Sequence, residues 1–156
     1  MPSTEPHASA WLSTLRAYLA VSAAAHLVWE ILQLPLYTIW TTGRARQMGF
    51  AVLHCTGGDI LIAALSLLAA LTLFGTRRWP AERNAGIFSA ALLIGVGYTI
   101  YSEWLNTGSR ASWAYSGLMP VVPGLGTGLS PILQWLVVPT AALRIATGAW
   151  PWHSRD

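Results

Sequence analysis

Hydrophobic residues along the chain gather in four long runs, which are separated by polar or glycine-rich segments. The runs cover approximately residues 15–40, 50–74, 85–105 and 129–147. Each is close to the ~20 residues that an α-helix needs to cross ~30 Å of hydrocarbon. No segment alternates apolar and polar residues over the length of a membrane-barrel strand. The pattern therefore predicts an all-α polytopic membrane protein, a four-helix transmembrane bundle made by a single domain over residues 1–156.

The connections between these runs differ in length and chemistry. Residues 41–47 and 75–84 are short, polar and rich in arginine. Residues 106–128 form a long connection rich in Gly, Pro and aromatic side chains, which we interpret as a flexible lid or entrance. Ser130 followed by Pro131 is typical of a helix start, with the serine as N-cap and the proline in the first turn.

The composition supports a membrane protein and excludes several other classes. Hydrophobic residues make up 54% of the chain and charged residues only 10%, whereas soluble domains carry about 25% charged residues. Nine Trp and five Tyr are typical of aromatic belts at membrane interfaces. The net charge of +3 reflects few acids rather than a basic patch, so we predict no nucleic-acid partner. The single Cys55 excludes an intramolecular disulfide and a cysteine-rich metal site.

The distribution of arginine predicts an orientation. Residues 1–14 contain no Lys or Arg, whereas a cleavable signal peptide begins with a basic segment, so we expect an uncleaved first helix. In an up-and-down bundle, six arginines lie on the side of the termini and three on the other side, and the positive-inside rule then places both termini in the cytoplasm. The first group is Arg16, Arg77, Arg78, Arg83, Arg144 and Arg155, and the second is Arg44, Arg46 and Arg110.

Polar and ionisable side chains interrupt all four runs toward the same end of the predicted bundle. His26, Glu30 and Gln33 fall within about 60° of one another at 100° per residue, which makes a narrow stripe on one helix face. A charged residue at the centre of a bilayer costs ~2.5–3.5 kcal/mol. We therefore expect the polar stripes to face each other. The other members of the layer are Asp59, Tyr98, Tyr101, Glu103, Asn106, Ser130, Gln134 and Trp135.

Each of these groups also has a structural interpretation. His26 and Glu30 could hydrogen-bond within their own helix, and Asp59 could be a first-turn acid that interacts with the helix dipole. Glu103 could be solvated at the interface. His54 and Cys55 fit packing better than ligation. The functional hypothesis takes His26, Glu30, Asp59 and Glu103 as catalytic candidates, and Gln33, Tyr98, Tyr101, Asn106, Gln134 and Trp135 as ligand-binding candidates.

Short motifs in all four runs resemble the EXPERA group of four-helix membrane proteins, in particular its emopamil-binding-protein branch of sterol isomerases. The segment HLVWEILQLPLY, with His26 and Glu30, is similar to the His-x-x-x-Glu segment of that branch. Asp59 stands where the second helix of the family opens with an acid. The segment GVGYTIYSEW, ending near Glu103, and the segment QWLVVP, with Trp135, are similar to the third and fourth helices.

The resemblance implies a double-bond isomerase that acts on an isoprenoid or steroid-like lipid, and it also makes a homodimer plausible. The family's acid in the second helix is Glu where this chain has Asp59. The asparagine that the family carries ahead of its tryptophan is replaced by Ile132, with Gln134 as the nearest amide. The group also includes binding proteins without known catalysis, so a fold resemblance does not fix an activity.

Three hypotheses follow. The first is an isomerase that uses buried acid and base residues, with no cofactor and with a hydrophobic small molecule or lipid as substrate. The second is a non-catalytic carrier that binds a lipid or a hydrophobic amine. The third is an intramembrane metal site, although the chain lacks an HExxH motif and a histidine-rich box. Its ligands would come from His26, Glu30, His54, Asp59 and Glu103.

Overall fold

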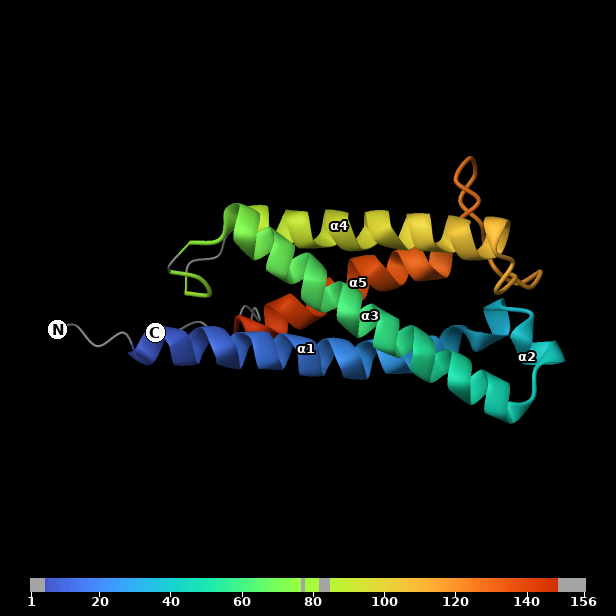
Figure 1. Ribbon diagram of the computed structural model, residues 1–156, viewed down its shortest axis with the longest axis horizontal. Helices are drawn as coiled ribbons and strands as arrows, with labels where there is room; N and C mark the ends of the chain where they lie inside the picture. Colours follow the sequence, from blue (N-terminus) through green and yellow to red (C-terminus); the bar gives the residue numbers. More distant parts are fainter. Residues whose placement is uncertain (1–4, 77, 82–84, 149–156) are drawn as a thin grey trace.

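The computed structural model describes residues 5–76, 78–81 and 85–148, and within them the chain is built from helices (Figure 1). Four of these helical segments are long and apolar enough to cross a membrane. This confirms the predicted all-α four-helix bundle. The elements are α1 (Glu5–Gln33), a 3₁₀ turn (Leu34–Leu36), α2 (Ile39–Thr42), α3 (Ala45–Phe74), α4 (Ala85–Glu103), a π-helical turn (Trp104–Ser109) and α5 (Leu129–Ala146).

The long helices pack in a ring in which α1 contacts α3 and α5, and α4 contacts the same two helices. In Figure 1, α3 starts beside the end of α1 and crosses the bundle to meet the start of α4, while α5 lies behind it. One end of the bundle carries α2, the π-helical turn and the connection 110–128. The short connection between α3 and α4 lies at the other end.

The first two membrane helices begin or end at other residues than the apolar runs predicted. The sequence predicted 15–40 for the first helix, but α1 begins at Glu5 and ends at Gln33. Pro35 lacks a backbone N–H and restricts the residue before it, so the chain tightens into a 3₁₀ turn there. Because α3 begins at Ala45, Asp59 lies near the middle of this helix, and the interpretation as a first-turn acid is wrong.

The start of α5 also differs from the prediction. Gly128, not Ser130, is the N-cap, and Ser130 lies inside the first turn with Pro131. The Ser130 hydroxyl donates a hydrogen bond to Gln33 Oε1 at 2.8 Å instead of capping its own helix. A side chain that the sequence assigned to a local role therefore links α5 to α1.

Small side chains fill part of the space between the helices, and many large apolar side chains face outward. Leu32 is 73% exposed and Leu93 is 74% exposed. Transmembrane helices pack through small residues because lipid solvates large apolar side chains as well as the protein interior does. The outward-facing leucines are therefore expected to contact lipid. Fully or almost fully buried alanines between the helices are Ala63, Ala70, Ala91 and Ala142.

Candidate functional site

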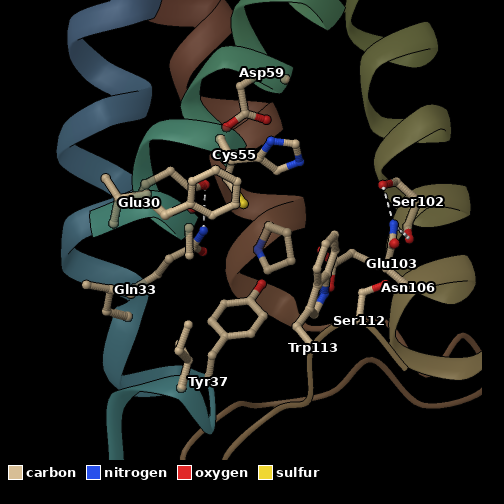
Figure 2. Close-up of a pocket in the computed structure, with 18 of the residues that line it drawn as sticks. Glu30, Gln33, Tyr37, Cys55, Asp59, Ser102, Glu103, Asn106, Ser112 and Trp113 are labelled. Carbon is tan, nitrogen blue, oxygen red and sulfur yellow. Dashed lines mark hydrogen bonds between the residues drawn. The ribbon is translucent and has the colours of Figure 1, made fainter. Parts of the chain in front are cut away.

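A cavity of about 1190 Å³ lies at the end of the bundle that carries α2 and the long connection. Residues of α1, α3, α4, α5 and the connection line it (Figure 2). A concave, mostly apolar space with a few converging polar groups is typical of small-molecule sites. The apolar part of the wall includes Leu34, Ile39, Phe50, Ile62 and Trp135.

The deep polar wall converges on the side-chain amide of Gln134, which is 2% exposed. Its Nε2 lies 2.9 Å from His26 Nδ1, 3.1 Å from Glu30 Oε1 and 3.0 Å from Asp59 Oδ2. An amide nitrogen has two N–H groups, so it cannot donate to three acceptors at once. At least one of the three neighbours must therefore carry a proton of its own or remain without a hydrogen bond from this amide.

A second amide and two further groups hold Glu30 in place. Gln33 Nε2 donates to Glu30 Oε1 at 2.7 Å. Gln33 Oε1 accepts from the Ser130 hydroxyl, which in turn accepts from Trp29 Nε1 at 3.1 Å. This chain of hydrogen bonds links α1 to α5 and orients the Glu30 carboxyl group.

His26 is fully buried and does not line the cavity. Its Nδ1 lies 3.3 Å from Asp59 Oδ2, and its ring packs against Trp135 with 5.3 Å between the ring centroids. Its Nε2 has no hydrogen-bond partner among the residues that the structure describes. The histidine therefore contacts Asp59 from outside the cavity lining.

The charges of this cluster are not balanced by arginine. Among the described residues, the one ion pair within it joins His26 and Asp59, and it exists only when the histidine is protonated. Two carboxylates that contact the same amide nitrogen repel each other unless a proton or a cation compensates them. Glu30 and Asp59 thus form a pair of neighbouring carboxyl groups at one amide.

A separate polar group occupies the opposite wall. Glu103 is buried and accepts a hydrogen bond from the Tyr115 hydroxyl, which also accepts from the backbone N–H of Gly128 at 2.9 Å. Burial, and then the hydrogen bond to Glu103, raise the pKa of Tyr115, so this hydroxyl stays protonated as a donor. Asn106 Nδ2 donates to the Ser102 carbonyl oxygen at 2.9 Å.

The structure brings most of the predicted site residues to one space. Figure 2 shows Glu30, Gln33 and Asp59 on one side of the cavity and Glu103 and Asn106 on the other. Gln134 and Trp135 line it as well.

The two tyrosines that were predicted to bind a ligand are both exposed. Tyr98 is 48% exposed and lines the cavity, whereas Tyr101 is 53% exposed and does not line it. The two rings contact each other, and Tyr101 also contacts Trp104. Tyr101 and Trp104, on α4 and the π-helical turn, are typical of an interfacial aromatic belt.

Two site residues were not identified in the sequence. Trp29 donates a hydrogen bond to the Ser130 hydroxyl, and Tyr115 donates one to the Glu103 carboxyl group. Trp29 lies one residue before Glu30, but a tryptophan there could equally have been a lipid anchor. Tyr115 lies in the long connection, where no periodicity indicates which side chains point inward.

The predicted metal ligands do not converge. Within the described part of the chain, no three His, Cys, Asp or Glu side chains are grouped so that they could hold a metal ion. His54 stacks on Phe50 of its own helix, with 5.5 Å between the ring centroids. The hypothesis of a metal site therefore lacks a ligand set here.

The fold and the site together define a multi-pass membrane protein with a polar, acid-containing cavity between its helices. Comparisons with family models, with curated proteins and with solved structures gave no match. The resemblance to the EXPERA group therefore rests on the short motifs in α1, α3, α4 and α5.

Proposed function

We propose that the protein binds an isoprenoid or steroid-like lipid in the cavity and moves one of its double bonds by proton transfer. The observation that carries this proposal is the meeting of the Glu30 and Asp59 carboxyl groups at one Gln134 nitrogen, 3.1 and 3.0 Å away. A double-bond isomerase needs one proton donor and one acceptor that lie close together and apart from bulk water. The resemblance to EXPERA isomerases points to the same chemistry.

The reaction conserves protons. One carboxyl group, in its acid form, gives its proton to an alkene carbon, and the π electrons form the new C–H bond, which leaves a carbocation on the neighbouring carbon. The other carboxylate removes a proton from the carbon on the far side of the cation. The electrons of that C–H bond become the new double bond. The pair then returns to its starting state when the proton passes between Glu30 and Asp59, which Gln134 holds together.

The surrounding residues have supporting roles in this proposal. His26 is a positioning residue, because it contacts Asp59 and Gln134 but does not line the cavity. Trp135 is 2% exposed overall and presents part of its ring to the cavity. An indole face stabilises a nearby cation by about 0.5–2 kcal/mol. It would act on the carbocation intermediate.

A non-catalytic carrier is the second candidate, and a specific observation favours it. A third carboxyl group, that of Glu103, also lines the cavity. A hydrophobic amine in this space would pair its charge with these acids without any chemistry. The two candidates differ in whether the bound molecule is changed.

The test is to identify the lipids that stay bound to the purified protein by native mass spectrometry, for wild type and for Glu30→Gln and Asp59→Asn. If the pair transfers protons, wild type converts the retained lipid to its double-bond isomer. Each variant should then still bind the lipid but convert it about 10²- to 10⁴-fold more slowly, the range for general acid–base groups. Thr72→Ala, on the exposed face of α3 away from the cavity, is the control and should convert at the wild-type rate.

Other results would change the assignment. An unchanged conversion rate in Glu30→Gln would show that Glu30 does not transfer a proton in the reaction. A lipid or amine that is retained by all four proteins and never altered would identify a carrier.

A further inference from the structure

Three arginines line the same cavity at its outer end. Arg44 precedes α3, Arg46 lies in its first turn, and Arg110 follows the π-helical turn after α4. All three are exposed. Among the described residues, none of them has a carboxylate within ion-pair distance, although three acids line the same space. The cavity thus has carboxyl groups in its deep part and unpaired guanidinium groups at its mouth.

The position of these arginines suits one kind of ligand. They come from two separate parts of the chain and line the cavity at the end of the bundle where the candidate membrane span of α3 begins and that of α4 ends. An end of a membrane span is expected to reach the headgroup region. Guanidinium groups bind phosphate with paired, charge-assisted hydrogen bonds.

We propose that the ligand is an isoprenoid-type amphiphile with a phosphate headgroup. The arginines hold the phosphate at the mouth, and the apolar chain runs past Phe50 and Ile62 toward Glu30 and Asp59. A neutral headgroup would leave the guanidinium groups without a counter-charge. This inference rests on the proposed lipid site and specifies its ligand, because it selects a phosphorylated chain over an uncharged steroid.

The experiment compares the binding of farnesyl phosphate and farnesol to the purified full chain in neutral detergent. Wild type should bind farnesyl phosphate at least about tenfold more tightly than farnesol. Arg46→Gln and Arg110→Gln should each weaken the binding of farnesyl phosphate by about three- to tenfold and leave farnesol unchanged. Arg44 is kept because it is the N-cap of α3.

The matched control is Arg144→Gln. Arg144 is exposed in the last turn of α5, at the other end of the bundle, and does not line the cavity. Its replacement removes the same charge and should leave the affinities for farnesyl phosphate and for farnesol unchanged. Inorganic phosphate is the second probe and should compete only weakly, because it lacks the apolar chain.

Each remaining outcome overturns the inference in a distinct way. Equal affinities for the two farnesyl probes, or an equal loss in Arg144→Gln, would show that the arginines do not select a headgroup, while the lipid site itself would stand. Tight competition by inorganic phosphate would indicate a site for free phosphate instead of a lipid headgroup. Failure of wild type to bind either farnesyl probe would contradict both the headgroup site and the proposed isoprenoid site.

Discussion

Gly95 and Trp135 illustrate how a single residue shapes the wall of the cavity. A Cβ atom on Gly95 would overlap the indole ring of Trp135. The missing side chain lets α5 place this ring between α4 and His26. Gly95 has no positive φ angle, so we infer that the glycine serves the close packing of the ring against α4 rather than an unusual backbone angle.

We expect Gly95→Ala to lower the free energy of unfolding by about 1–3 kcal/mol, the usual cost of overpacking a buried site. Gly97→Ala is the matched control, because a Cβ there meets no atom within 4 Å. Both changes gain the same helix propensity. Denaturant titration in detergent micelles measures the two effects. Equal stability of the two variants would show that the Trp135 ring can move aside.

At the scale of elements, the long connection is tied to the bundle rather than loose. The backbone N–H of Thr38 donates to the Ala114 carbonyl oxygen at 2.9 Å, and that of Ser116 donates to the Leu36 carbonyl oxygen at 2.9 Å. Tyr115, between them, joins Glu103 of α4 to the start of α5. The connection therefore closes one side of the cavity with hydrogen bonds to three separate elements.

Tyr115→Phe removes the hydroxyl that joins Glu103 to the Gly128 N–H, and we expect this side of the cavity to open more often. A loss of 1–2 kcal/mol corresponds to a factor of about 5–30 in an opening equilibrium. Hydrogen–deuterium exchange of the amides in residues 114–128 should accelerate by that factor. Tyr101→Phe, on the exposed face of α4, is the control. Similar exchange in both variants would show that the backbone hydrogen bonds alone hold the connection.

At the scale of the whole molecule, the bundle is polarised along its axis. Its cavity, its three buried or partly buried acids and Arg44, Arg46 and Arg110 lie toward one end. Of the six arginines assigned to the other end, Arg16, Arg78 and Arg144 are described, and Arg77, Arg83 and Arg155 lie outside the described residues. Because the larger arginine group faces the cytoplasm in most membrane proteins, the cavity is predicted to face away from it.

The orientation is tested by labelling single cysteines in intact cells, in a Cys55→Ser background. Thr76→Cys and Ser109→Cys place an exposed thiol at opposite ends of the bundle. A membrane-impermeant maleimide added from outside should label position 109 and not position 76. Labelling of position 76 alone would place the termini outside and turn the cavity toward the cytoplasm.

The sequence by itself determined the class of the protein and the layer in which its polar groups lie. Runs of about 20 apolar residues have few stable alternatives to membrane helices, because lipid cannot satisfy backbone hydrogen bonds. Because an α-helix rises by a constant amount per residue, the depth of Glu30, Glu103 and Gln134 along their helices followed from counting residues. The i, i+4 spacing of His26 and Glu30 placed both on the buried face of α1.

Only the tertiary structure decided which of these side chains meet. The rotation of each helix about its own axis depends on contacts with its neighbours, which is why Tyr101 points outward although it was predicted to bind a ligand. The local sequence favoured Ser130 as a helix cap, but Gln33 of another helix supplies its partner. Gln134 became the centre of the site because α1, α3 and α5 converge there, and such a convergence of distant segments has no signature in a single sequence.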